Sequence, residues 1–517
     1  MTGATPELLI DRGLRRPDAA AVVDGTGVAT YRDLDVDSRR VAASLLDGGA
    51  DLAEARVAYL VAPGRDHVAV QWGIWRAGGI AVPLAMSHPE PELAALLDDA
   101  RPVAIIAGAE LVDRVATCAG TRRIRVATCA ATLGERPSDA LPELTPDRRA
   151  LMVYTSGTTG RPKGVVTTHG ILRAQITTLV RAWDWRDEDR ILHVLPLHHV
   201  HGIVNVLCCA LWTGATCEFL PRFEPAAAWE RLASGEISVF MAVPTIYGRL
   251  TAAWDEADDE TRLSWSRGAR RLRLMVSGSA ALPVPLLERW RAITGHTLLE
   301  RYGMTEIGMA LSNPLDGERR AGTVGQTLPG TLVRLVDDVG RPVTPGTPGE
   351  IEVQGPQVFR EYWDRADETA RAFREGWFRT GDVAVLEAGY YRILGRQSTD
   401  IIKSAGYKIS ALEIEAALRE HPAVADCAVV GVPDPDLGER VVAAVVWREP
   451  EATNPAALAV WVRERLASYK APREILTVDE LPRNAMGKVT KPDLRALCES
   501  SQRDQPAQRI EPPAGSD

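Results

Sequence analysis

A chain of 517 residues is too long for one hydrophobic core and predicts two or more domains. The net charge of −9 argues against a nucleic-acid partner, and no apolar run is long enough to span a membrane. The first residues do not resemble a signal or transit peptide, and the seven cysteines show no paired spacing. We therefore expect a globular protein of the reducing cytoplasm, with neither a membrane nor a nucleic acid as partner.

The first part of the chain alternates short apolar runs with helical patterns. This order predicts a mostly parallel, doubly wound sheet. The predicted strands are 57–61, 80–84 and 103–107, and the predicted helices are 68–76 and 92–100.

A glycine-rich loop between Tyr154 and Gly164 follows an apolar run at 150–153 that predicts a buried strand. Glycines let consecutive backbone N–H groups point at one anion, the hydroxyl side chains add donors, and Lys163 adds a positive charge. The loop lacks the Gly-Lys-Ser/Thr ending of a Walker A motif, and a helix is expected after it, at 170–185. An ordinary turn would not need Arg-Pro-Lys-Gly after a buried strand, so we interpret the loop as a phosphate cradle. Its predicted ligands are Thr155, Ser156, Gly157, Thr158, Thr159, Gly160 and Lys163.

Three histidines lie close together at His198, His199 and His201. A His-x-His pair could bind a metal, but no cysteine or carboxylate stands at ligand spacing, which argues against zinc. We expect His198 to pack under a turn.

Two further strands are predicted at 239–243 and 272–276, separated by a polar, irregular stretch at 255–266 that we expect to be a surface excursion. The second strand ends at Ser277. Since ligands of open α/β sheets bind outside the carboxyl ends of strands, Thr155 and Ser277 are expected to face one crevice.

The segment Glu-Arg-Tyr-Gly-Met-Thr-Glu, which ends at Glu306, combines groups that suit a nucleotide. Tyr302 offers a ring for adenine, and Thr305 and Glu306 offer oxygen ligands for Mg²⁺. Further along, a Pro- and Gly-rich stretch at 331–353 predicts a β subdomain, and the carboxylate of Asp382 could accept two hydrogen bonds from a vicinal diol.

In this order, the motifs resemble those of the adenylate-forming superfamily of acyl-CoA synthetases, luciferases and peptide-synthetase adenylation domains. The likeness covers nearly the whole chain and rests on 154–164, 298–306, 377–382, 395–409 and 482–488. It implies an α/β fold with a large N-terminal domain of doubly wound mixed sheets plus a β subdomain at 1–395. A small, mobile α+β C-terminal domain would span 396–500, with a disordered tail at 501–517. The hinge would be Ser398 or Thr399.

The resemblance also implies a role for each motif. ATP would meet the phosphate loop, Mg²⁺ would bind Thr305 and Glu306, and Lys488 would bridge the carboxylate and the α-phosphate. Rotation of the small domain would then replace Lys488 by the face around Lys403, and CoA would bind at Ser404, Ala405 and Gly406. The other implied ATP-binding residues are Ser277, Gly278, Ser279, Glu300, Tyr302, Gly303, Asp382 and Arg396.

The acyl pocket implied by the family is lined by His199, Val200, Arg301 and Met304, and Arg249 could add a second positive charge to substrate binding. An arginine at position 301 suits a second carboxylate. The motifs around it closely resemble malonyl-CoA synthetases, so malonate and methylmalonate are the expected acids, with ATP, Mg²⁺ and CoA.

Three alternatives stay open. Arg301 could pair with a glutamate in a synthetase for another small acid, or the chain could be a free-standing adenylation domain that loads a carrier protein. A non-catalytic nucleotide-binding protein is less consistent with the presence of Lys488, Glu306 and Asp382. Lys488 is also a candidate for regulation by a lysine acetyltransferase and deacetylase, because acetylation removes its charge.

Overall fold

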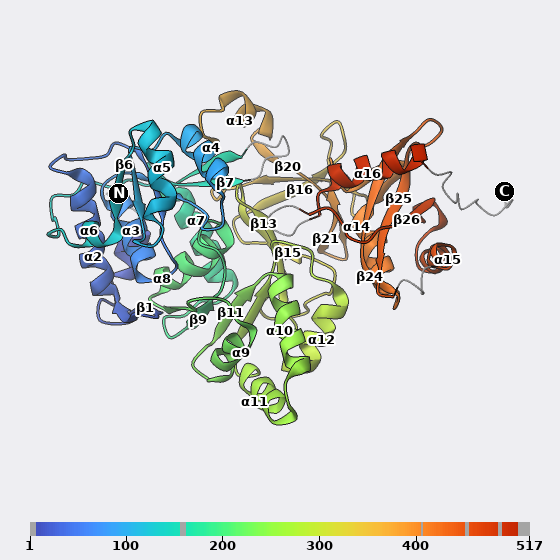
Figure 1. Cartoon of the computed structure of the whole chain (residues 1–517), viewed down its shortest axis with the longest axis horizontal. Helices are drawn as coiled ribbons and strands as arrows, with labels where there is room; N and C mark the ends of the chain where they lie inside the picture. The colour runs from blue at the N-terminus through green and yellow to red at the C-terminus, as the bar shows by residue number, and fades with distance from the viewer. Residues whose placement is uncertain (1–6, 156–161, 405–406, 450–453, 484–488, 505–517) are drawn as a thin grey trace. The chain divides into compact units, whose positions relative to one another are not determined.

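The computed structural model of the chain describes residues 7–155, 162–404, 407–449, 454–483 and 489–504 (Figure 1). They form two compact units, the first made of Met1–Val333 and Val353–Phe378, the second of Arg334–Glu352 and Arg379–Asp517. The domain boundary predicted at residue 395 lies within strand β21 (Tyr390–Arg396) and remains a prediction.

The first unit contains a seven-stranded sheet in the order β18-β8-β7-β4-β3-β5-β6. The strands from β7 to β6 are joined by parallel pairs, whereas β8 and β18 pair antiparallel at one edge. Strands β4 and β5 are buried throughout, as expected where a sheet is covered on both faces. The bounds are β3 Arg56–Leu60, β4 Ile80–Pro83, β5 Ala104–Ala107, β6 Arg125–Thr128, β7 Arg149–Thr155, β8 Lys163–Thr168 and β18 Glu361–Tyr362.

The same unit contains a nine-stranded sheet in the order β15-β14-β13-β12-β11-β9-β10-β1-β2. Its central strands, from β13 to β1, are parallel, and β14, β15 and β2 pair antiparallel at the two edges. The bounds are β1 Ala20–Asp24, β2 Gly27–Thr30, β9 Arg190–His193, β10 Thr216–Phe219, β11 Val239–Ala242, β12 Leu274–Ser277, β13 Leu299–Met304, β14 Gly308–Ser312 and β15 Gln326–Thr327.

One hydrophobic core is shared by the two sheets. It contains Tyr59 of β3, Ile191 of β9 and Trp72 of helix α3, a helix that is buried on almost all sides. The helices of this unit are α1 Leu9–Gly13, α2 Tyr31–Leu46, α3 Arg65–Arg76, α4 Glu90–Ala100, α5 Val112–Arg122, α6 Cys129–Leu133, α7 His169–Ala182, the π-helix η1 His201–Cys208, α8 Cys209–Thr213, α9 Pro225–Ala233, α10 Pro244–Glu256, α11 Asp259–Ala269, α12 Val284–Thr294 and α13 Ala366–Ala372.

One expectation from the sequence is wrong and another is incomplete. The stretch 255–266 is mostly helical, because Asp258 caps α11 by accepting a hydrogen bond from the Thr261 N–H at 2.8 Å and Trp265 stacks on Trp229 with ring centroids 5.5 Å apart. The helix expected at 170–185 is present as α7, but strand β8, which the sequence analysis did not predict, comes before it, so the phosphate loop connects two antiparallel strands.

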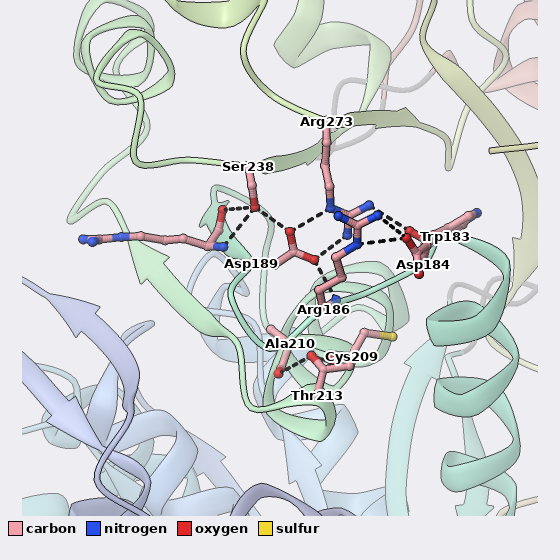
Figure 2. A network of polar contacts seen from close by, with 10 residues as sticks. Trp183, Asp184, Arg186, Asp189, Cys209, Ala210, Thr213, Ser238 and Arg273 are labelled. Carbon is pink, nitrogen blue, oxygen red and sulfur yellow. Dashed lines mark hydrogen bonds and ion pairs between the residues drawn. The ribbon is translucent and has the colours of Figure 1, made fainter. Parts of the chain in front are cut away.

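A buried carboxylate ties together the amino ends of three parallel strands (Figure 2). Asp189, Ser238 and Arg273 directly precede β9, β11 and β12. Asp189 accepts hydrogen bonds from the Ser238 hydroxyl and from Arg273 Nε, each at 2.7 Å, and from the Arg186 backbone N–H at 2.8 Å. Since ligands of such sheets bind at the carboxyl ends, this network anchors the opposite end of the sheet.

The second unit contains a five-stranded sheet, β23-β22-β25-β24, with β26 paired to β25. Ser410 caps helix α14 by accepting a hydrogen bond from the Glu413 N–H at 3.2 Å. Another sheet, in the order β16-β17-β20-β19 with β21 paired to β20, contains the strands in which the chain passes between the units. The remaining bounds are β16 Leu332–Val336, β17 Gly349–Gln354, β19 Phe373–Arg374, β20 Trp377–Glu387, β22 Ile401–Ser404, β23 Tyr407–Ser410, α14 Ala411–Arg419, β24 Val424–Asp434, β25 Gly438–Trp447, α15 Pro455–Arg465, the 3₁₀ helix η3 Ser468–Lys470, β26 Glu474–Thr477 and α16 Lys491–Asp504.

The predicted tail begins inside helix α16, which extends to Asp504, and the rest of the tail lies outside the described residues. Among the residues that the structure describes, no helix has the length and hydropathy needed to cross a bilayer.

Candidate active site

The phosphate loop leaves the first sheet at Thr155 and re-enters it at Lys163, and these two residues are paired across β7 and β8. The predicted ligands Ser156, Gly157, Thr158, Thr159 and Gly160 lie outside the described residues. Lys163 Nζ forms an ion pair with Glu368 Oε2 at 2.5 Å and lies 5.2 Å from the centroid of the Tyr362 ring. The ammonium group at the carboxyl-terminal end of the predicted phosphate loop is thus held by Glu368 and Tyr362.

The proposed magnesium ligands lie in the turn between β13 and β14. Glu306 is 5% exposed, and its Oε1 accepts a hydrogen bond from the Tyr362 hydroxyl at 2.9 Å. Tyr362 therefore contacts both Glu306 and Lys163, which brings the first and second motifs together. No group of three or more His, Cys, Asp or Glu that could hold a metal occurs among the described residues. The oxygen donors of Thr305 and Glu306 fit Mg²⁺, which binds through few protein ligands together with phosphate oxygens.

Arg301 is a buried cation with incomplete hydrogen bonding. Its side chain lies on β13, is 3% exposed, and has no hydrogen-bond partner for Nε or Nη2 within the described part of the chain. Burial lowers its pKa to about 10, opposed by the charge of Glu300, so the guanidinium stays protonated at neutral pH. A Cβ on Gly278 would lie 2.5 Å from Arg301 Cζ, so only glycine at position 278 leaves room for this guanidinium.

Glu300 does not neutralise Arg301 by direct contact, since no ion pair joins them in the described structure. Its Oε1 instead accepts a hydrogen bond from the Leu282 N–H at 3.1 Å. Burial raises the Glu300 pKa to about 7, against that hydrogen bond and the charge of Arg301. Arg301 thus has no direct carboxylate partner among the described residues.

Neutral polar groups surround the same place. His201 Nδ1 lies 3.1 Å from the Ser279 hydroxyl, and burial followed by the charge of Arg301 holds the His201 pKa well below its usual value. His201 Nε2 and the Ser277 hydroxyl are buried with no hydrogen-bond partner in the described residues. Sequence reasoning placed His199 in the pocket and missed His201. The available signal was its position two residues further along the same motif.

The other predicted pocket residues differ in placement. Val200 is buried, His199 and Met304 are half-buried, and Tyr302 and Gly303 precede Met304 on β13. Arg249 is exposed on α10, where its guanidinium lies 4.8 Å from the centroid of the Phe223 ring. The structure therefore gives Arg249 a stacking partner and shows no contact between it and Arg301.

In the second unit, two predicted nucleotide-binding residues face each other across β20 and β21. Asp382 is paired with Arg396 in the sheet, and its Oδ1 lies 3.0 Å from Arg396 Nε. Lys403 is exposed on β22, with its backbone N–H bonded to Glu439, and Ser404 is buried. The predictions for Ala405, Gly406 and Lys488 fall outside the described residues.

Comparisons with known proteins identify the family of the chain. The AMP-binding enzyme family matches residues 10–363, and the AMP-binding enzyme C-terminal domain matches residues 413–488. The chain is 47% identical to the mitochondrial malonate–CoA ligase ACSF3 of Mus musculus, over 98% of this chain and 93% of that protein.

Solved structures show the same similarity. ATP-bound MatB from Rhodopseudomonas palustris has a TM-score of 0.87 at 34% identity, covering 95% of this chain and 99% of that chain. A malonyl-CoA ligase with methylmalonyl-CoA and AMP bound has a TM-score of 0.66 at 40% identity, covering 90% and 97%. The predicted α/β fold with a large N-terminal and a smaller C-terminal domain is confirmed. The chain belongs to the AMP-binding enzyme family, the adenylate-forming ligases that its motifs predict.

Proposed function

We propose that this chain is a malonate–CoA ligase that also accepts methylmalonate. One carboxylate of the acid attacks the α-phosphorus of ATP and expels diphosphate, and the CoA thiolate then attacks the acyl-adenylate and expels AMP. The observation that carries the choice of acid is the buried, incompletely bonded guanidinium of Arg301. The near full-length likeness to malonate–CoA ligases supports it.

The second carboxylate of malonate would complete the surroundings of Arg301. A buried cation without a partner is costly, and guanidinium–carboxylate pairs are strong because they are charge-assisted and can be bidentate. His201 and the hydroxyls of Ser277 and Ser279 are neutral groups that can donate to the same carboxylate. An acid without a second carboxylate would leave these donors unmatched.

ATP and CoA are the co-substrates, since one similar solved structure holds ATP and another holds methylmalonyl-CoA and AMP. Lys163, at the end of the phosphate loop, is proposed to bind the phosphates, and the paired Asp382 and Arg396 are proposed to hold the ribose. Thr305 and Glu306 would hold Mg²⁺, which when bound would screen the charge that develops on the phosphates. Lys488 is proposed to bridge the two reacting groups.

Diphosphate release tests this function. Malonate and methylmalonate should release diphosphate efficiently, and acetate, propionate and succinate poorly, with turnover continuing only when CoA is present. Equal rates for all acids would favour a ligase for another small acid. Turnover with a carrier protein in place of CoA would favour a free-standing adenylation domain, and binding of ATP without release would indicate a non-catalytic protein.

Two further parts of the account are proposals. All seven cysteines are free thiols, which fits a reducing compartment such as the cytoplasm. Lys488 is proposed as a target of a lysine acetyltransferase and deacetylase, because acetylation removes the charge that adenylation needs. Full activity of a Lys488-acetylated preparation would contradict this regulation.

A further inference from the structure

The segment 359–369 runs beside both catalytic motifs, although its sequence contains none of the predicted site residues. The Phe359 N–H donates to the Glu306 carbonyl at 2.7 Å. The Arg360 N–H donates to the Val166 carbonyl at 2.9 Å, and the Trp363 N–H donates to the Gly164 carbonyl at 2.7 Å. Backbone hydrogen bonds therefore join this segment to the turn that carries Glu306 and to the strand that begins at Lys163.

Tyr362 lies at the centre of this segment and is 9% exposed. Its backbone pairs with Val165 of β8, and its ring packs on Phe359 with centroids 4.8 Å apart. These contacts fix the direction of the ring. The hydroxyl donates to Glu306 Oε1 at 2.9 Å, and Lys163 Nζ lies 5.2 Å from the ring centroid. A rigid side chain thus links the carboxylate of the second motif to the ammonium of the first.

Side chains on the same segment reinforce this arrangement. Glu368 pairs with Lys163, and the hydrogen bond from Lys163 holds the Glu368 pKa below its usual value. Arg365 Nη2 and the Tyr154 hydroxyl both donate to the carboxylate of Asp99, each at 2.7 Å. The strand that leads into the phosphate loop is therefore tied to the segment as well.

We propose that Tyr362 is a positioning residue that holds the Glu306 carboxylate in the orientation needed for the magnesium ion bound with ATP. A donor at one oxygen restricts rotation of the carboxylate, and the donor itself is fixed by the strand pairing of β18 with β8. Lys163 over the same ring ties the phosphate loop to that orientation. This proposal rests on the ATP-dependent function proposed above.

Calorimetric binding of ATP to Tyr362→Phe tests the role of the hydroxyl, because the substitution keeps the ring beneath Lys163. We expect ATP affinity to fall ~10-fold or more in Mg²⁺, as for the loss of a hydrogen bond to a charged group, and to stay unchanged in EDTA. The matched control is Tyr31→Phe, which removes a buried hydroxyl that donates to the Ala215 carbonyl at 2.7 Å. It should bind ATP like the wild type in both buffers.

The same binding assay in Glu306→Gln completes a double-mutant cycle. If Tyr362 acts through Glu306, Tyr362→Phe has no further effect on ATP affinity in that background. Equal losses of affinity with and without Mg²⁺, or independent losses in the double variant, would overturn the proposal. Magnesium-dependent ATP binding by a wild-type protein that releases no diphosphate with any acid would instead refute the proposed function and leave the role of Tyr362 standing.

Discussion

At the scale of single residues, the main feature of the candidate site is the incomplete hydrogen bonding of Arg301. Its guanidinium is buried, retains its charge at neutral pH, and has two nitrogens without partners in the described structure. Removing a charge from water costs several kcal/mol unless a partner of opposite charge compensates, so such a group points to an anionic ligand. Glu300 cannot serve fully, because its carboxylate is bonded to the Leu282 backbone and burial raises its pKa to about 7.

Gly278→Ala should displace this guanidinium without removing its charge. The new methyl group would meet Arg301 Cζ at 2.5 Å, so the side chain must move. We expect the ratio of kcat/KM for malonate to that for propionate to fall ~10²-fold, as misplacement of a catalytic or binding group by about 1 Å can cause.

Gly120→Ala is the control for that substitution, since a Cβ there meets nothing within 4 Å. Steady-state kinetics of both variants with both acids provide the measurement. An unchanged ratio in Gly278→Ala would show that the position of Arg301 does not govern acid selectivity.

At the scale of secondary-structure elements, the residues that anchor the nine-stranded sheet lie apart from the residues proposed for the reaction. The Asp189 network joins the amino ends of β9, β11 and β12. Ser277 is the last residue of β12, and Arg301 lies within β13, one residue beyond the residue that is paired with Ser277. Because these strands are parallel, the two groups of residues lie at opposite ends of the sheet. Substitutions at the two ends should therefore have different consequences.

Asp189→Ala should destabilise the protein by ~3–5 kcal/mol at pH 7, because it leaves Arg273 without its buried partner. Burial raises the pKa of Asp189, but hydrogen bonds from Arg273, Ser238 and Arg186 outweigh it and hold the pKa below its usual value. A lowered carboxyl pKa gives stability that is present above the unfolded pKa of about 3.9 and is lost as pH falls through the folded value.

The difference in stability between the wild type and Asp189→Ala should accordingly be full at pH 7 and shrink below about pH 4. Urea denaturation across this pH range measures it. The exposed pair of Arg32 and Asp18 supplies a control, since Asp18→Ala should cost only ~0–1 kcal/mol. A loss for Asp189→Ala as small as that of the control would contradict the anchoring role.

Elements that are buried on both faces could be predicted from the sequence, and those that depend on distant partners could not. Strands β3, β4 and β5 can be recognised in the sequence from their apolar runs alone. Helix α11 was missed because most of its face is polar and its burial rests on Trp265 packing against Trp229, in another helix. Strand β8 follows the loop at once and is defined by pairing with β7 and β18.

The site follows the same division. Arg301 could be proposed from the sequence because it stands in a recognisable motif, at a position that the family resemblance assigns to the acyl pocket. Tyr362 could not, because its link to Glu306 and Lys163 depends on β18 joining the edge of the sheet at β8. A tyrosine in a segment without a motif carries no sign of such a contact in the sequence.

At the scale of the whole molecule, the residues proposed for the reaction are divided between the two units. The first unit carries Lys163, Glu306 and Arg301, and the second carries the Asp382–Arg396 pair and, in its sequence, Lys488. The resemblance to adenylate-forming enzymes predicts that the small domain serves the two half-reactions in different orientations. This mobility is a prediction that kinetics can test.

Lys488→Ala should separate the half-reactions. Loss of one electrostatic contact at the reacting phosphate is expected to slow adenylate formation ~10²–10³-fold. Conversion of supplied malonyl-adenylate and CoA to malonyl-CoA should proceed at the wild-type rate, because Lys488 is predicted to serve only the first step. Rapid-quench measurements of each step provide the test, and equal losses in both steps would contradict the division of roles.

The most direct test of the central claim is kcat/KM for malonate and for propionate in the wild type, Arg301→Ala and Arg301→Lys. If Arg301 binds the second carboxylate, Arg301→Ala loses ~2–5 kcal/mol of transition-state stabilisation with malonate and far less with propionate. The kcat/KM of Arg301→Lys for malonate should lie between those of the wild type and Arg301→Ala, because lysine keeps the charge but lacks the planar guanidinium. A parallel drop for both acids in Arg301→Ala would show that Arg301 supports the fold rather than malonate recognition, and would contradict the account.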